Sequence, residues 1–267
     1  MCITGKLHTA KEKHSLVEAF LSIGIQGEIP SFEEIQKLLE GGNFNSMFEK
    51  VEPVRNMVSL TSPTEGNNSS QELPNSATRG FKIIGFNNGR AERYIQLNPI
   101  GPSNAVLSFH TTDYIRWDDF KSQLKEDIEA IAKILGSSNV SFFATSFIDS
   151  FFYDKSEDYD GKALFNIHST RLSEDAISQN LMDFKQIMKK EKGNRTYQDN
   201  LSVSVYDRDD SKRIEIISNI TFPIEPEQFS ELISEDDFYD TLDFAHNENK
   251  TMLRDILNEE IIKIIKL

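Results

Sequence analysis

The chain has 267 residues and a formal net charge of −14, with 38% hydrophobic and 27% charged residues. These proportions are typical of a globular protein, and the length suffices for one large domain or two small ones. No apolar run reaches the ~20 residues that a membrane span needs. The single cysteine, Cys2, excludes an internal disulfide, and this fits a reducing compartment. We therefore expect a cytoplasmic protein without membrane contact.

The first third of the chain is expected to start with a frayed, polar N-terminus over residues 1–15. Residues 16–25 then predict a strand, and a capping box at Ser31-Phe-Glu-Glu34 predicts a helix. A second strand is predicted over residues 51–60. Residues 62–76 contain almost no apolar side chain, so they predict a mobile insertion.

The middle of the chain contains the strongest strand signals. A hairpin with a turn at Asn87-Asn-Gly89 is predicted over residues 81–98, because the Asn-Gly dipeptide favours tight turns. Residues 105–110 alternate between apolar and polar side chains, as in a half-buried strand. Residues 118–135 have the three- and four-residue apolar spacing of an amphipathic helix. Residues 140–153 are apolar on both faces, which indicates a central strand covered by a helix.

The last third of the chain mixes both element types. Residues 163–168 predict a strand, and residues 173–190 predict a helix because apolar side chains recur at three- and four-residue spacing. Alternating patterns predict a strand pair. Two closing helices are expected. The predicted strand pair and closing helices cover residues 201–206, 213–222, 227–245 and 249–265.

The order of these elements predicts an α+β fold with a mainly antiparallel, curved sheet and helices on one side. Strand, helix, hairpin and helix occur in this order in residues 16–136 and again in residues 137–267. We interpret this repetition as two structurally duplicated halves that share one sheet, although this interpretation carries no function.

Four segments of the chain stand out together: Leu16-Val-Glu-Ala19, Ile95-Gln-Leu97, Tyr114-Ile-Arg-Trp-Asp-Asp-Phe120 and a C-terminal helix that bears His246. With these segments the chain, most clearly over residues 92–153, resembles an uncharacterised prokaryotic family described as a sporadically distributed protein. The family's Arg-Tyr-Ile-Asn-like run is replaced here by Thr145-Ser-Phe-Ile-Asp149. The resemblance implies no established activity, but it implies a setting of mobile defence or toxin–antitoxin genes.

The C-terminal region combines acidic and apolar features. Residues 225–260 contain 12 acidic and 2 basic residues, and therefore supply most of the negative charge. The last helix is apolar around more than one face, which indicates deep burial or a shared interface. We expect partner binding or self-association there. The candidate partner-binding residues are Leu253, Ile256, Leu257, Ile261, Ile264, Ile265, Asp236, Asp237 and Asp240.

A nucleic-acid partner is not expected for a chain of this charge, because affinity for phosphate backbones comes from Lys and Arg. One basic cluster is the exception, at the end of the helix predicted over residues 173–190. Such a cluster is more often a solvated helix end. It consists of Lys185, Lys189, Lys190, Lys192 and Arg195.

Catalytic motifs are absent from the sequence. It contains no Gly-rich phosphate-binding loop and no nucleophile elbow, and one cysteine cannot form a cysteine zinc site. We expect no cofactor and assign no metal ligand. The one weak catalytic candidate is a carboxylate group around the end of the predicted central strand, formed by Asp149, Asp154 and Asp158.

Three functional hypotheses follow. The first is a non-enzymatic protein-interaction subunit of a prokaryotic antiviral defence or toxin–antitoxin module, which docks through the acidic region and the Ile-rich terminal helix. The second is a divalent-metal-dependent phosphodiesterase or nuclease that uses the clustered carboxylates. The third is an acidic mimic of nucleic acid that inhibits a basic partner.

Overall fold

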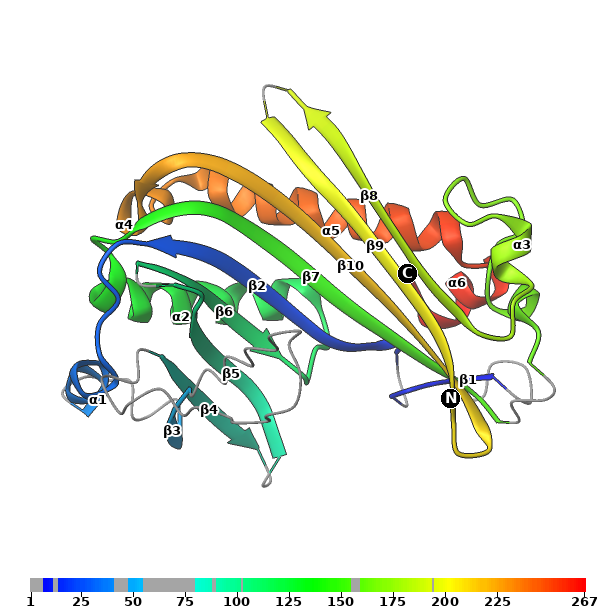
Figure 1. Cartoon of the computed structure of the whole chain (residues 1–267), viewed down its shortest axis with the longest axis horizontal. Helices are drawn as coiled ribbons and strands as arrows, with labels where there is room; N and C mark the ends of the chain where they lie inside the picture. The colour runs from blue at the N-terminus through cyan, green and yellow to red at the C-terminus, as the bar shows by residue number, and fades with distance from the viewer. Residues whose placement is uncertain are drawn as a thin grey trace, which may run out of the picture.

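A single antiparallel sheet with helices along one face forms the framework of the computed structural model (Figure 1). The structure describes residues 7–11, 14–40, 48–54, 80–87, 90–101, 103–154, 159–193 and 195–267. The predicted fold class is confirmed: the chain is α+β, and the sheet does not close into a barrel.

The sheet has the strand order β3-β4-β5-β6-β2-β7-β10-β9-β8, and β1 pairs with β7 outside this path. The strands are β1 (Leu7–Thr9), β2 (Leu16–Gln26), β3 (Lys50–Pro53), β4 (Phe81–Asn87), β5 (Arg90–Pro99), β6 (Asn104–Thr111), β7 (Asn139–Tyr153), β8 (Met182–Lys192), β9 (Arg195–Arg208) and β10 (Ser211–Gln228). β7 lies between β2 and β10, so the prediction of a central strand is confirmed.

The two sides of the sheet repeat one strand order. β2 pairs with the last strand of the β4–β5–β6 meander, and β7 pairs with the last strand of the β8–β9–β10 meander. β2 and β7 then pair with each other at the centre of the sheet. This is the order that two duplicated halves would have, and the duplication itself stays a prediction.

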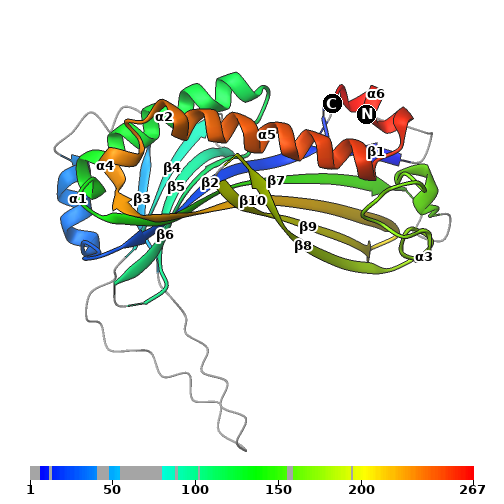
Figure 2. The ribbon, with the colours of Figure 1, turned by 90° about the horizontal axis from the view of Figure 1, so that it is seen from above.

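The two long helices, α2 and α5, lie along the same face of the sheet (Figure 2). The helical elements are α1 (Phe32–Glu40), α2 (Trp117–Leu135), the 3-10 turn η3 (Gly161–Ala163), α3 (Glu174–Ile177), α4 (Phe229–Leu232), α5 (Asp236–Ile256) and α6 (Glu259–Ile265). The apolar spacing expected of residues 118–135 becomes the buried stripe of α2, which includes Leu124, Ile128 and Ile131.

Buried side chains form two apolar clusters on the helix side of the sheet. The first lies under α2 and the start of α5, and it includes Phe143 and Phe147 of β7. The second lies under the end of α5 and α6, and it includes Phe151 of β7 and Ile261 of α6. β7 thus contributes to both clusters. The boundary between them falls on polar residues, which the next subsection describes.

The helix predicted over residues 173–190 is wrong. Only Glu174–Ile177 are helical, and Met182–Lys192 form strand β8. The apolar side chains have helical spacing, but β8 pairs with β9 along its whole length, from Met182 opposite Val205 to Lys192 opposite Arg195. Backbone pairing in the sheet therefore decided the conformation, and propensity did not.

Two further expectations also need correction. Residues 163–168 form no strand, because Gly161–Ala163 is a 3-10 turn and Phe165 makes an isolated bridge to Leu257. The N-terminus does not fray throughout, because Leu7–Thr9 pair with β7 and Leu7 is fully buried. The insertion predicted at residues 62–76 lies outside the described residues.

The closing helices differ from prediction in their boundaries. Asp236–Ile256 is one uninterrupted helix, and the break falls at Leu257 and Asn258. The Asn258 side chain accepts a hydrogen bond from the backbone N–H of Ile261 at 3.0 Å, and so caps α6. Within the described part of the chain, no helix is both long and apolar enough to cross a membrane.

Candidate functional site

A pocket of about 490 Å³ opens between the sheet, the start of α2 and the middle of α5. We call it the His246 pocket. Its walls come from the segment before β2, from β7, from the loop that leads into α2, from α5 and from the end of α6. The lining residues that the argument uses are His14, Ser15, Tyr114, Arg116, Trp117, Asp149, His246, Asn249, Lys250 and Lys266.

The aromatic wall of the pocket brings together two motifs that are far apart in the chain. The Trp117 indole lies parallel to the His246 imidazole, with 4.4 Å between ring centroids and 7° between ring planes. Phe147 packs against both rings. The Trp117 Nε1–H donates a hydrogen bond of 2.6 Å to Asp243, one turn before His246 on α5. The start of α2 is therefore fixed to α5.

His246 lies on the buried stripe of α5, and 7% of its surface is exposed. Its Nδ1 atom is buried and has no hydrogen-bond partner among the described residues. Burial and the nearby Lys250 ammonium lower the pKa of His246 to about 4, against the opposing effect of Asp243. The imidazole is therefore neutral at pH 7, and it can donate or accept a hydrogen bond through its free nitrogen.

Asp149 on β7 is a carboxyl group that lies in the interior, where 4% of its surface is exposed. Ser15 donates a hydrogen bond of 2.6 Å to its Oδ1 atom. Burial raises the pKa of Asp149 to about 6, and the Ser15 hydrogen bond opposes this effect only in part. Burial, followed by the Asp149 charge, also raises the pKa of the Tyr114 hydroxyl. Both groups are thus biased toward their neutral forms.

Basic side chains line the same pocket. Arg116 and Lys266 are exposed, and Lys250 is half-buried. In the described part of the chain, none of these three side chains forms an ion pair or a hydrogen bond. By contrast, other cations of the protein, such as Arg93 and Arg171, are held by buried carboxylates. In a chain of net charge −14, these three unpaired cations outnumber the two acidic side chains that line the pocket, Asp118 and Asp149.

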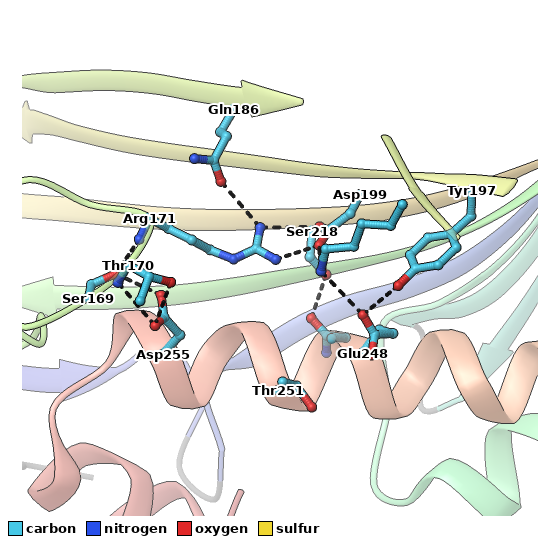
Figure 3. Close-up of polar contacts among 12 residues, drawn as sticks. Ser169, Thr170, Arg171, Gln186, Tyr197, Asp199, Ser218, Glu248, Thr251 and Asp255 are labelled. Atoms are coloured by element: carbon cyan, nitrogen blue, oxygen red, sulfur yellow. Dashed lines mark hydrogen bonds and ion pairs between the residues drawn. The ribbon is translucent and has the colours of Figure 1, made fainter. Parts of the chain in front are cut away.

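Behind the pocket, a band of polar side chains crosses between α5 and the sheet (Figure 3). Asn249, which lines the pocket, accepts a hydrogen bond from the buried Ser218 hydroxyl of β10. The preceding residue on α5, Glu248, accepts hydrogen bonds from Tyr197 at 2.8 Å and from Lys190 at 3.3 Å. This band separates the two apolar clusters and fixes the rotation of α5 about its axis.

The centre of the band is Asp199 of β9, of which 1% is exposed. Arg171 forms a two-pronged ion pair with it, and the Lys190 ammonium lies 2.7 Å from its Oδ2 atom. Burial disfavours the charge, but the hydrogen bonds from both cations outweigh burial and lower the pKa of Asp199. Arg171 also donates to Gln186 of β8 at 3.3 Å, as Figure 3 shows. The charge of Asp199 is therefore compensated by Arg171 and Lys190 within the protein.

The segment before Arg171 is attached to the same helix. Asp255 of α5 accepts hydrogen bonds from the Ser169 hydroxyl at 2.8 Å and from the Thr170 backbone N–H at 3.1 Å (Figure 3). The loop that contains Arg171 is therefore anchored to α5 at the two residues that precede the arginine. The band is a structural support for the pocket rather than a second ligand site.

The apolar residues expected to bind a partner are mostly inside the molecule. Leu253, Ile256, Leu257 and Ile261 are at most 2% exposed and belong to the second apolar cluster. For these four residues the expectation is wrong, because their side chains already pack on the sheet of their own chain. The remaining two, Ile264 and Ile265, are half-buried.

The charged candidates are at the surface. Asp236, Asp237 and Asp240 are exposed at the start of α5. The basic cluster does not lie at a helix end, because its members belong to the β8–β9 hairpin. Lys190 is paired with Asp199 and Glu248, Arg195 is paired with Asp237, and Lys192 lies over the Phe244 ring, whereas Lys185 and Lys189 are exposed on the opposite face.

The carboxylates proposed for a metal site do not come together. Asp149 faces the interior, whereas Asp154 is about half exposed and bonded to His8 at 2.8 Å. Asp158 lies outside the described residues. Among the residues that the structure describes, no group of three or more His, Cys, Asp or Glu side chains could hold a metal ion.

Sequence reasoning missed His14, Ser15, Arg116, Asn249 and Lys250 as site residues. One signal was available, because His246 and Asn249 place polar side chains within a mainly apolar buried stripe, which also includes Thr241. The convergence of the Tyr-x-x-Trp-x-x-Phe segment on the His246 helix was not visible in the chain order. No protein-family model matches the chain, and no curated protein was found to be similar to it.

Proposed function

We propose that the protein is a ligand-binding module and that the His246 pocket accepts a small anionic molecule. The observation that carries this proposal is the combination of unpaired Arg116 and Lys250 with the buried, unpartnered Nδ1 of His246 in one pocket. The pocket volume of about 490 Å³ falls in the range of small-molecule sites, roughly 300–1,000 Å³.

An anion is favoured over a cation by the state of the ionisable groups. The Arg116 guanidinium and the Lys250 ammonium attract an anion, and the His246 imidazole is neutral and adds no opposing charge. Burial raises the pKa of Asp149 only to about 6, so its carboxyl group is mostly ionised at pH 7 and opposes an anion there. A ligand with a carboxylate or phosphate group would further favour the protonated form of Asp149.

Binding is better supported than catalysis. Ser15 donates to Asp149, but within the described structure no hydrogen bond continues from this pair to His246. A nucleophile and a base in hydrogen-bond contact, with a third group that orients the base, would be needed for nucleophilic catalysis. The pocket therefore offers unpaired cations and an aromatic wall, which together favour recognition over nucleophilic chemistry.

The proposal is tested by the fluorescence of Trp117, which is the sole tryptophan and lies in the pocket wall. Titration with inorganic phosphate, citrate and a nucleoside monophosphate should change the emission in a saturable way for at least one of these anions. Arg116→Ala and Lys250→Ala should each weaken that binding roughly tenfold, as expected for loss of a charged contact.

A matched control is Lys133→Ala, because Lys133 is exposed on α2 and does not line the pocket. It should leave the titration unchanged. If all three anions leave Trp117 fluorescence unchanged, or if Lys133→Ala weakens binding as much as Arg116→Ala, the pocket is not an anion site.

A second candidate function is docking to a basic protein partner through the start of α5. It is supported by the exposure of Asp236, Asp237 and Asp240 and by crowding of carboxylates next to them. Burial, together with the charges of Glu235 and Glu231, raises the pKa of Glu227. The prokaryotic defence or toxin–antitoxin setting belongs to this candidate and is supported by the sequence resemblance alone.

The docking candidate predicts a complex whose affinity falls as salt is added, because exposed charges are screened. Asp236→Lys combined with Asp240→Lys should abolish co-purification with the product of a neighbouring gene. Retention of the complex by this variant at low salt would exclude docking through the start of α5.

A further inference from the structure

We propose that β8 is an interaction surface for a second copy of the chain, and that two β8 strands pair antiparallel to form one continuous sheet. Figure 1 shows β8 at the outer edge of the sheet. Among the described residues it pairs with β9 alone. An edge strand with free backbone groups is a template for another strand.

The length and regularity of β8 suit such pairing. It has 11 residues, Met182–Lys192, and pairs with β9 in a continuous register without a bulge. Ile187 lies at its middle and is 59% exposed, and Leu181, just before the strand, is exposed to the same extent. Large apolar side chains at an unpaired edge are what a second strand would cover.

The exposed face of β8 carries charges that its own sheet does not neutralise. Asp183, Lys185, Lys189 and Glu191 alternate with the helix-facing residues and are all exposed. Their cross-strand neighbours on β9 are uncharged: in the same order, these are Ser204, Ser202, Gln198 and Thr196. No ion pair joins any of the four to another described residue. These charges are therefore free to select the register of a second strand.

The charge pattern excludes the symmetric register centred on Ile187. In that register Lys185 would face Lys189 of the second copy, and Asp183 would face Glu191, so that all facing charges would repel. Like charges directly opposite each other destabilise a strand pair. This repulsion explains how lysines at the edge prevent unspecific association.

A register centred on Gln186 is complementary. It places Asp183 of each copy opposite Lys189 of the other, and the two-fold axis makes this pair occur twice. On the helix-facing side, Phe184 then lies opposite Met188, and the two Gln186 amides meet at the axis. A register centred on Met188 is the competing arrangement, and it would instead pair Lys185 with Glu191.

The experiment is light scattering coupled to size-exclusion chromatography at low ionic strength, over a wide range of protein concentrations. The wild-type protein should approach twice the 30.5 kDa of one chain. Asp183→Lys and Lys189→Asp should each weaken dimerisation roughly tenfold or more, because each converts two attractive pairs into two repulsive ones. The double variant Asp183→Lys/Lys189→Asp should restore it, because the pairs are then inverted.

Two controls keep the test specific. Lys133→Asp changes the net charge as Lys189→Asp does, but lies on α2, and it should not affect dimerisation. Circular dichroism verifies that each variant is folded. A wild-type mass of one chain at every concentration overturns the proposal, and so does failure of the double variant to recover. Disruption by Lys185→Glu with rescue by Glu191→Lys would replace the Gln186 register with the Met188 register.

Discussion

The indole of Trp117 lies flat on the imidazole of His246, with 4.4 Å between their centroids. This contact joins the first residue of α2 to the middle of α5, and the Trp117 hydrogen bond to Asp243 strengthens the junction. A parallel aromatic pair adds roughly 0.5–1.5 kcal/mol beyond the burial of its area. One wall of the His246 pocket is therefore preorganised, which reduces the ordering that a ligand would require.

The first prediction concerns the stability that His246 contributes at neutral pH. The pKa of His246 is about 4 in the folded state and near 6.5 when exposed, so the unfolded chain binds the proton more readily. The stabilising contribution of the neutral ring is therefore present above pH 6.5 and is lost as pH falls toward 4. His246→Phe keeps a ring against Trp117 but cannot titrate. Between pH 7.5 and pH 4.5, the wild type should lose roughly 2–3 kcal/mol of unfolding free energy that His246→Phe retains.

Urea unfolding of the wild type and His246→Phe at both pH values measures this difference. Other carboxyl groups titrate over the same range, so the informative quantity is the difference between the two proteins. His168→Phe is the matched control, because His168 is exposed, and it should follow the wild type. Identical pH profiles for wild type and His246→Phe would show that His246 is not desolvated.

The second prediction concerns Asp149, whose contribution to stability falls as pH rises, the opposite of the contribution of His246. Its pKa is raised from 3.8 to about 6, so the folded state favours the protonated carboxyl. The associated stability is fully present below pH 3.8 and is lost as pH rises through 6. Asp149→Asn removes the charge and retains an oxygen that can accept the Ser15 hydrogen bond. It should stabilise the fold at pH 7.5 by roughly 2–3 kcal/mol and have little effect at pH 4.

The same urea titration checks this prediction, with Asp154→Asn as the exposed control. A stabilising substitution in the wall of a pocket is the pattern expected where function maintains an unfavourable group. Destabilisation by Asp149→Asn at pH 7.5 would contradict this and would indicate that the carboxylate has a cationic partner in solution.

Much of the architecture was predictable because the local spacing of apolar side chains indicates which segments are strands and which are helices. The strand predicted over residues 16–25 is β2, and the two apolar faces of residues 140–153 correctly predicted the central position of β7. The capping box also forms, with Ser31 and Glu34 bonded to each other's backbone N–H groups. In these segments the local preference and the tertiary environment agree.

Prediction failed where tertiary contacts decide between two local options. Residues 173–190 fit a helix by apolar spacing, but pairing with β9 makes Met182–Lys192 a strand. The site could not be assembled for a related reason. His14, Trp117, Asp149 and His246 come from four separate segments of the chain, and the sequence contains no signal that these segments meet. The polar interruption of the α5 stripe at His246 and Asn249 was the one hint available.

The third prediction separates a packing role from a docking role for the C-terminal apolar residues. Leu253 and Ile261 are buried in the second apolar cluster, so truncation leaves a cavity. Leu253→Ala and Ile261→Ala should each lower the free energy of unfolding by about 2–5 kcal/mol. Ile100→Ala is the control, because Ile100 is 69% exposed, and it should cost less than about 0.5 kcal/mol. Chemical denaturation measures the stability of all three variants. An unchanged denaturation midpoint for Ile261→Ala would show that the Ile261 side chain is not packed inside the fold.

The fourth prediction concerns the buried ion pair of Arg171 and Asp199, which lies at the centre of the polar band. Arg171→Met leaves the Asp199 carboxylate, of which 1% is exposed, with Lys190 as its remaining cation. Removing one partner of a buried pair typically costs about 3–5 kcal/mol, because the other charge is left without compensation. Since Lys190 still compensates part of the charge, we expect about 2–4 kcal/mol. Urea unfolding at pH 7 measures this loss.

Asp199→Leu in the Arg171→Met background distinguishes an uncompensated charge from lost packing. Replacement of both members by apolar residues removes the buried charge, so this double variant should recover at least half of the lost stability. Lys162→Met is the matched control, because Lys162 and Glu174 form an exposed pair, and its cost should stay below about 1 kcal/mol. If the double variant is less stable than Arg171→Met, the ion pair is net stabilising. In that case the attraction between Arg171 and Asp199 itself stabilises the position of α5 and of His246. The penalty for leaving one buried charge unpaired would then be the smaller effect.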